Sequence, residues 1–131
     1  MLRSNKQIDP PPPLHELEAE VMEELWGSGE SSVRDVMQAL NKEGTDRAYT
    51  TYMTVMARLH KKRLLARRRE GKTDYYTPAY DRDEYMTLRA RAEVDELVTQ
   101  YGDAALSHFA RRVASLDPAR RRALQRLART D

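Results

Sequence analysis

Residues 47–72, RAYTTYMTVMARLHKKRLLARRREGK, carry the pattern on which the predicted fold depends. In the first part of this stretch, apolar residues recur at steps of three and four, the spacing of one helix face. The face consists of Tyr49, Tyr52, Val55, Met56 and Leu59, with Met53 and His60 at its edge. These residues predict a helix from about 47 to 63. Beyond it, the turn Glu70-Gly71-Lys72 separates two short runs of strand-forming residues, which predicts a β-hairpin with a basic tip.

The charge of the chain is concentrated in this same stretch. Residues 47–72 contain nine Lys and Arg against one Glu, a net charge of +8 in a chain whose total is only +2. The blocks on either side are acidic: residues 14–46 have two basic and nine acidic residues, and residues 81–103 have three and seven. An ordinary solvated face would mix both signs, so this segregation indicates a polyanionic partner.

The residues before this stretch predict two further helices. Leu14, Leu17, Val21 and Leu25 repeat at helical spacing until Trp26, which precedes Gly27 and Gly29. Ser31-Ser32 can cap a second helix that runs to about Leu40. Three helices followed by a hairpin form the order of a winged helix-turn-helix, in which the third helix enters the major groove. We therefore expect a mainly α fold with a winged-helix DNA-binding domain over residues 14–80, with Trp26, His60, Tyr75 and Tyr76 as packing residues.

The remaining residues, 81–131, predict a helical dimerisation domain. A helix over about 82–101 has apolar residues on two sides, and further helices follow Asp103 and the pair Asp117-Pro118. Because so thin a lobe has little core of its own, we expect it to pair with a second copy. The candidate dimerisation residues are Val94, Leu97, Leu106, Phe109, Val113 and Leu124.

The candidate DNA-binding residues lie on the polar side of the third helix and on the hairpin. Hydroxyl and cationic side chains can donate to phosphates, while Thr methyl groups and Arg can contact base edges. The candidates are Thr50, Thr51, Thr54, Arg58, Lys61, Arg67, Arg69 and Lys72. Strand alternation puts Arg67 and Arg69 on one face of the hairpin and Arg68 on the other.

Other chemistry finds little support in the sequence. The chain has no cysteine, and its three histidines are too far apart for a zinc motif or a catalytic arrangement, so we expect no enzyme activity, metal or cofactor. No apolar run is long enough to span a membrane, and the N-terminus lacks the features of a signal peptide, which favours the cytoplasm. Residues 1–13, which end in four prolines, are expected to form a disordered arm.

Three passages resemble the penicillinase-repressor (BlaI/MecI/CopY) family of winged-helix regulators, and the BlaI branch above all. They are LEAEVMEELW at 17–26, AYTTYMTVMARLHKKRLLARRREGKTDYYTP at 48–78 and LSHFARRV at 106–113. The resemblance implies a homodimer that is held by its C-terminal helices, binds a palindromic operator and represses β-lactam-resistance genes. It also implies a membrane sensor-protease as a partner in induction.

In this family, induction leads to cleavage of an Asn-Phe bond in the dimerisation helix. The matching position here is His108–Phe109, where the Phe is kept and the Asn is replaced. The copper-responsive branch has a C-terminal cysteine cluster, which this chain lacks. Two other readings remain open at this point: a winged-helix repressor of another stimulus, such as metal or oxidative stress, and a helical adaptor whose basic segment binds an acidic protein.

Overall fold

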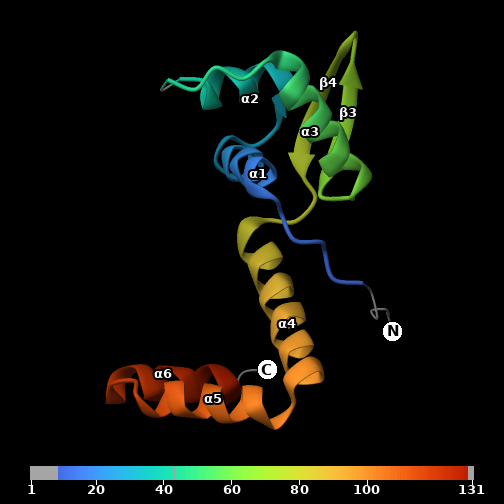
Figure 1. The fold of residues 1–131 in the computed structure, drawn as a ribbon. Coiled ribbons are helices and arrows are strands. Elements are labelled where there is room, and N and C mark those ends of the chain that lie inside the picture. The colour runs from blue at the N-terminus through green and yellow to red at the C-terminus, as the bar shows by residue number, and fades with distance from the viewer. Residues whose placement is uncertain (1–8, 43, 130–131) are drawn as a thin grey trace. The chain divides into compact units, whose positions relative to one another are not determined.

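The computed structural model describes residues 9–42 and 44–129, and the chain divides into two compact units, Met1–Ala90 and Arg91–Asp131. The first unit contains helices α1 (Glu16–Ser28), α2 (Val33–Leu40) and α3 (Tyr49–Lys61), strands β2 (Ser31–Ser32), β3 (Leu65–Glu70) and β4 (Thr73–Pro78), and the start of α4 (Arg82–Tyr101). The second unit contains the rest of α4, α5 (Asp103–Ala114) and α6 (Pro118–Arg129). Three helices and a hairpin in this order confirm the predicted mainly α fold (Figure 1).

Local capping explains where the first helices begin. The backbone N–H of His15 donates to the Glu18 carboxylate at 2.9 Å, at the start of α1. Ser32 and Asp35 form a capping box at the start of α2, with each backbone N–H donating to the other's side chain (3.0 and 3.1 Å). The predicted cap at Ser32 is therefore confirmed.

Helix α3 turns one face to the core and the other to solvent. Tyr52, Val55, Met56 and Leu59 are buried. Tyr49 was predicted on this buried face, but it is 42% exposed, because it is the first residue of the helix and lies at the margin of the core. The helix ends at Lys61, two residues before the predicted end, since Arg63 adopts a left-handed φ of 66°.

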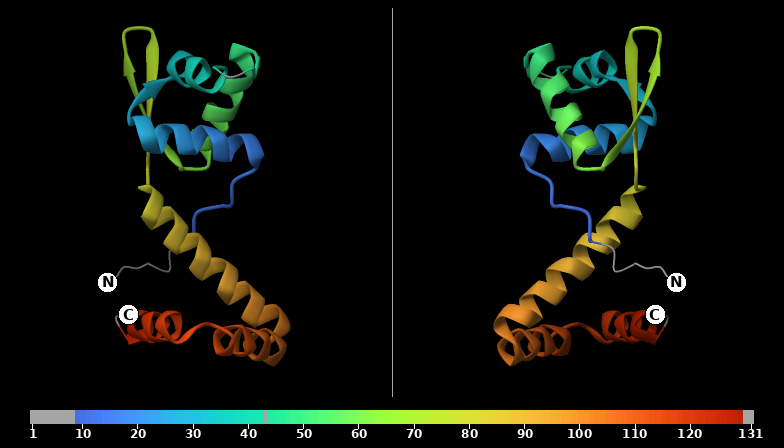
Figure 2. Two further views of the ribbon diagram at one scale, coloured as in Figure 1. Left: turned by 90° about the vertical axis from the view of Figure 1, so that its left-hand side faces the viewer. Right: turned by 90° about the vertical axis from the view of Figure 1, so that its right-hand side faces the viewer.

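The hairpin belongs to a three-stranded antiparallel sheet of order β2-β4-β3. Arg67 pairs with Tyr76 and Arg68 with Tyr75, and the turn contains Gly71 with a φ of 64°. Figure 2 shows the hairpin extending beyond the helices of the first unit. The strand β2, which pairs with Tyr75 and Tyr76, was not predicted, because two serines carry no strand pattern of their own.

The core of the first unit gathers side chains from all three helices and the sheet. Trp26 is half-buried: its indole N–H donates to the Tyr80 carbonyl at 2.9 Å and its ring packs on Tyr85 with centroids 5.6 Å apart. His60 is half-buried against Tyr76, edge to face. The buried hydrophobic residues are Val21, Met22, Leu25, Val33, Val36, Tyr52, Val55, Met56, Leu59, Leu64, Leu65, Tyr76 and Tyr85.

The proline run is held against the first turns of α4. The Tyr85 hydroxyl donates to the Pro12 carbonyl at 2.7 Å, Arg89 Nη1 donates to the Pro11 carbonyl at 3.0 Å, and Pro11 is buried. A disordered arm was expected over residues 1–13, but its last part is held in place by these hydrogen bonds. Residues 1–8 lie outside the described part of the chain. The same contacts assign the start of α4 to the first unit, whereas the sequence placed the domain boundary after residue 80.

In the second unit, the described residues 91–129 include no buried side chain. Gly102 caps α5 with a φ of 57°, and Asp103, which the sequence analysis placed before this helix, is its first residue. Asp117 caps α6, because its carboxylate accepts the Arg120 backbone N–H at 2.8 Å. In the described parts of both units, no helix is long and apolar enough to cross a membrane.

Candidate nucleic-acid interface

The exposed face of α3 brings together the candidate residues of that helix. At about 100° per residue, Thr50 and Lys61 lie opposite the buried stripe, Thr54 lies beside them, and Thr51 and Arg58 lie at one flank. All five side chains are exposed. No acidic residue occurs anywhere in α3, and Arg58 and Lys61 lie in its last turn. The face therefore offers hydroxyl and cationic donors without a competing carboxylate of its own helix.

On the hairpin, the three arginines differ in what they contact. Arg68 Nη2 lies 2.9 Å from Glu30 Oε1 and its Nη1 lies 2.6 Å from Glu70 Oε1, and the guanidinium stacks over the Tyr75 ring at 5.0 Å. The hydrogen bonds to Glu30 and then Glu70 raise the pKa of Arg68. The exclusion of Arg68 from the candidate set agrees with these contacts, because its charge is already balanced within the fold.

Arg69 and Arg67 are both held less firmly than Arg68. Arg69 Nη1 lies 3.6 Å from Asp74 Oδ1, which is long for an ion pair. Among the described residues, neither Arg67 nor Lys72 has an acidic partner, and both side chains are exposed. Of the hairpin candidates, Arg67 and Lys72 therefore have the cations most available to an external anion.

Two cations of the +8 stretch, Arg47 and Lys62, bind carboxylates of α1 and so stabilise the fold. Arg47 lies 3.2 Å from Glu20 Oε2, and its Nη1 donates to the Tyr52 hydroxyl at 3.2 Å. Tyr52 in turn donates to Asn41 Oδ1 at 2.7 Å. These bonds fix the segment that leads into α3, so Arg47 helps to hold α3 in position. The order of charges along the sequence cannot separate such cations from exposed ones.

The second structural cation, Lys62, binds a buried carboxylate. Lys62 Nζ lies 2.8 Å from Glu18 Oε2, and the Glu18 side chain is 2% exposed. Burial raises the pKa of Glu18, but the His15 backbone N–H and Lys62 together outweigh it, so the net pKa of this carboxyl lies below its usual value. The charged pair joins the start of α1 to the end of α3 and holds α3 in place.

Arg34, Tyr49 and Met53 lie beside the candidate surface, but they were not among the predicted DNA-binding residues. A hollow of about 490 Å³ lies between the start of α2, α3 and the hairpin, and Arg34, Tyr49, Met53 and Lys72 help to line it. The Arg34 guanidinium lies 5.8 Å from the centre of the Tyr49 ring. Met53 was placed at the edge of the apolar stripe, and its exposure of 44% could be recognised only from the packing.

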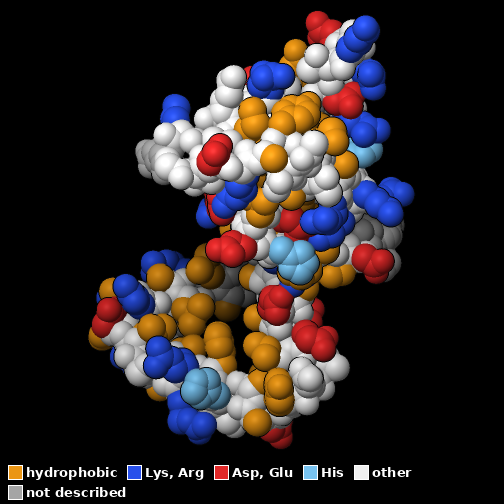
Figure 3. Space-filling model, turned by 45° about the horizontal axis from the view of Figure 1, so that its top comes forward, with side chains coloured by type: hydrophobic (Ala, Val, Ile, Leu, Met, Phe, Trp, Pro, Cys, Tyr) orange, Lys and Arg blue, Asp and Glu red, His pale blue; other side chains and the backbone are white. Residues whose placement is uncertain are grey.

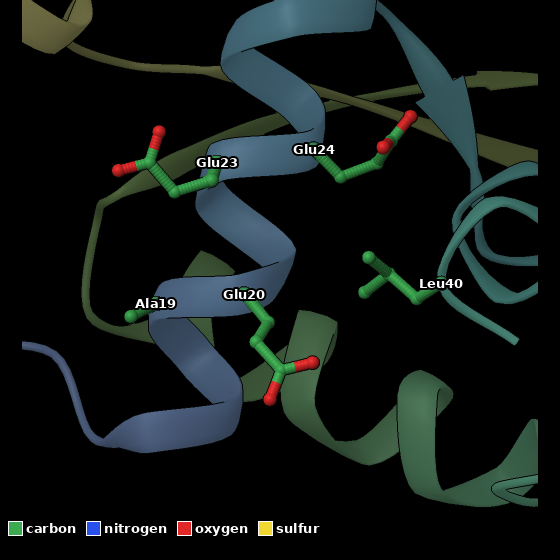
Figure 4. A pocket seen from close by; sticks show the side chains of 5 residues that line it. All are labelled: Ala19, Glu20, Glu23, Glu24 and Leu40. Atoms are coloured by element: carbon green, nitrogen blue, oxygen red, sulfur yellow. The ribbon is translucent and has the colours of Figure 1, made fainter. Parts of the chain in front are cut away.

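A second hollow has the opposite charge. Figure 4 shows Glu20, Glu23 and Glu24 projecting from α1, with Leu40 of α2 across from them. Glu20 binds Arg47, and Glu23 binds Arg82 with a shortest distance of 3.0 Å. Because its lining, among the described residues, contains no Lys or Arg, this hollow offers no cation to a phosphate, unlike the face formed by α3 and the hairpin.

The candidate dimerisation residues are on the surface of the second unit. Phe109 is 61% exposed, Val94 and Leu106 are more than half exposed and Leu97 is 48% exposed, whereas Val113 and Leu124 are half-buried. His108 is exposed next to Phe109, within α5. Leu97, Tyr101, His108 and Phe109 help to line an apolar hollow of about 330 Å³ in this unit. In the described residues, no cluster of three or more His, Asp or Glu is placed to hold a metal ion.

A winged helix with a carboxylate-free recognition helix and an exposed basic hairpin defines a DNA-binding regulator. The solution structure of the DNA-binding domain of the repressor BlaI is similar to this chain, with a TM-score of 0.51 and 31% identity. The match covers 60% of this chain and 94% of that domain. The winged-helix prediction is confirmed.

Sequence comparisons place the chain more narrowly. The penicillinase repressor family model matches residues 14–130. The transcriptional regulator BlaI of Mycobacterium tuberculosis (strains CDC 1551 / Oshkosh and H37Rv) is 40% identical over 119 residues, which are 87% of this chain and 84% of that protein. The penicillinase repressor of Bacillus licheniformis is 30% identical over 81 residues, 62% of each chain. The chain belongs to the penicillinase repressor family, a family of DNA-binding transcriptional repressors and not of enzymes.

Proposed function

We propose that this repressor binds a palindromic operator as a homodimer, with one winged helix on each half-site. The proposal depends on one observation: large apolar side chains of the second unit, such as Leu106 and Phe109, are more than half exposed. A second copy of the same chain offers a matching apolar surface, because a twofold interface uses the same patch on both partners. Val94, Leu97, Val113 and Leu124 are the further residues assigned to this interface.

Each winged helix binds DNA through α3 and the hairpin. Thr50, Thr51 and Thr54 contact the duplex along the helix, Arg58 and Lys61 at its end, and Arg67, Arg69 and Lys72 from the hairpin. Joining two such units raises the effective concentration for the second half-site and increases affinity on the order of 10²–10⁴-fold. Repression therefore depends on the dimer, and loss of the dimer releases the operator.

The regulated genes and the mode of release follow from the family. We assign to this repressor the control of β-lactam-resistance genes. It acts in the cytoplasm and does not insert into a membrane. A membrane sensor-protease releases it from the operator by causing cleavage of the His108–Phe109 bond. The exposure of both residues of this bond supports access by a protease. Cleavage within α5 would divide the proposed dimer interface.

The dimer is tested by a charge placed in the interface. Phe109→Asp should convert the chain to a monomer in sedimentation equilibrium and lower operator affinity at least 100-fold, since avidity is lost. Ser107→Asp is the matched control, because it adds the same charge at an exposed position on the opposite side of α5, outside the apolar hollow. A Phe109→Asp variant that stays dimeric at micromolar concentration would refute this placement of the interface.

The DNA surface is tested by a pair of neighbouring arginines. Arg58, Lys61, Arg67, Arg69 and Lys72 provide five cations per protomer, so the log–log salt dependence of operator binding should have a slope of about −9 for a dimer. Arg67→Ala should reduce this slope by about 2, whereas Arg68→Ala should leave it unchanged, because Arg68 is neutralised by Glu30 and Glu70. Equal slopes for Arg67→Ala and the wild type would exclude Arg67 from the interface. Equally tight binding to specific and scrambled duplexes would favour a general DNA-coating protein, whereas little affinity for either duplex would favour the adaptor.

A further inference from the structure

The middle of the exposed face of α3 carries methyl groups rather than charges. Thr50, Met53, Thr54 and Ala57 are all exposed and follow one another at i, i+3, i+4 and i+7. They therefore form one continuous stripe along the helix. Each ends in or contains a methyl group that faces outward from the core-forming stripe of the same helix. Met53, the largest of the four, leaves 44% of its surface exposed.

The charges around this methyl stripe lie at its margins. Arg58 and Lys61 occupy the last turn of α3, and Lys72 of the hairpin turn lines the same hollow as Met53. Asp74 also lines this hollow, but its carboxylate lies 3.6 Å from Arg69 Nη1. In Figure 3, hydrophobic side chains (orange) are exposed near the hairpin, with Lys and Arg (blue) around them. An apolar centre within a cationic margin matches a surface whose middle is apolar and whose edges are anionic.

The major groove of DNA is such a surface where it contains thymine. Phosphates line both of its edges, and the thymine C5-methyl is the one apolar group that a base pair presents there, whereas the minor groove has none. The methyl stripe rises about 10 Å from Thr50 to Ala57, at 1.5 Å per residue. This length corresponds to about three base-pair steps of 3.4 Å.

We propose that Thr50, Met53, Thr54 and Ala57 recognise thymine methyl groups in the major groove and so determine which operator sequence is bound. The inference rests on the proposed operator binding and adds the chemical feature that is recognised. Each half-site then contains thymine at one or more positions that face the stripe. Burying one methyl group between protein and base strengthens binding about fourfold.

Removal of single methyl groups from the DNA tests the proposal. Duplexes that bind the full-length chain are selected from a random-sequence library, and each thymine of the selected site is then replaced singly by deoxyuridine. This replacement removes the methyl group and leaves every hydrogen-bonding group of the base in place. For the wild type, at least one replacement per half-site should weaken binding about fourfold.

Two variants of α3 then assign the effect to the stripe. Met53→Ala removes the largest side chain of the stripe and keeps a good helix former at an exposed position, so the fold should be retained. This variant should bind the thymine duplex more weakly and lose its sensitivity to deoxyuridine at one position. Lys61→Ala is the matched control, because it should weaken binding to all duplexes and keep the full fourfold effect at every position.

The outcomes separate this inference from the function on which it rests. Selected sites without thymine, or wild-type binding that no deoxyuridine replacement changes, would overturn methyl recognition while leaving operator binding intact. Unchanged sensitivity in Met53→Ala would exclude Met53 from methyl recognition and overturn the four-residue stripe as proposed. A selection that enriches no sequence at all would instead refute the proposed operator binding.

Discussion

In the described residues up to Ala90, thirteen hydrophobic side chains form one buried core, whereas in residues 91–129 no side chain is buried. Both regions have helices with regular apolar stripes, so the difference does not lie in the local pattern. In the first unit, two further helices and a sheet cover the stripes of α1 and α3. In the second unit, Leu106, Phe109 and Leu127 remain more than half exposed. An amphipathic helix thus predicts that a face will be covered, but not whether its own chain covers it.

The largest expected effect tests this difference in core directly. Leu59→Ala should lower the free energy of unfolding by about 2–5 kcal/mol, because Leu59 is fully buried and the change leaves a cavity. Leu106→Ala should instead lower stability only through the dimer, so that its effect becomes smaller as the protein is diluted. Urea denaturation at two protein concentrations measures both. A concentration-independent loss of similar size in Leu106→Ala would show that the second unit has a core of its own.

A smaller effect is expected at the buried ion pair of the first unit. Glu18→Gln should destabilise the chain by about 1.5–3 kcal/mol at pH 7, because a charge-assisted hydrogen bond to Lys62 is lost. The folded pKa of Glu18 lies below its unfolded value of about 4.5, so its contribution is present above that pH and is lost as the pH falls through the folded pKa.

Denaturation curves of the wild type and Glu18→Gln should therefore converge below about pH 4.5. Glu16→Gln is the control, because it removes the same charge at an exposed position in the first turn of the same helix. A constant difference between wild type and Glu18→Gln from pH 7 to pH 3 would contradict the role assigned to this charge.

The smallest effect concerns the contact between the proline run and the start of α4, within the first unit. Tyr85→Phe should cost about 0.5–1.5 kcal/mol of stability, because it removes the hydrogen bond to the Pro12 carbonyl. Tyr101→Phe is the matched control on the same helix, since the Tyr101 side chain is 58% exposed. Equal stabilities of the two variants would mean that the proline run does not stabilise the first unit.

The sequence predicted the elements of the first unit because their signals are local. The capping box at Ser32 and the stripe of Tyr52, Val55, Met56 and Leu59 depend on neighbours within one or two helix turns. The strand β2 escaped prediction because Ser31 and Ser32 become a strand only by pairing with β4. The proline run was misjudged for the same reason, since its partners Tyr85 and Arg89 lie more than seventy residues away.

For the candidate site too, contacts between distant residues could not be predicted from the sequence. The sequence by itself determined that a basic helix and hairpin follow two other helices, because periodicity and charge are properties of consecutive residues. Only the tertiary structure decided which cations are available. Arg47, Lys62 and Arg68 face carboxylates of distant segments, while Arg67 and Lys72 face none in the part of the chain that the structure describes. The tertiary structure also decided that Tyr49 and Met53 are exposed beside the hairpin. The physical reason is that burial and ion pairing depend on which surfaces the folded chain brings together, and consecutive residues do not record this.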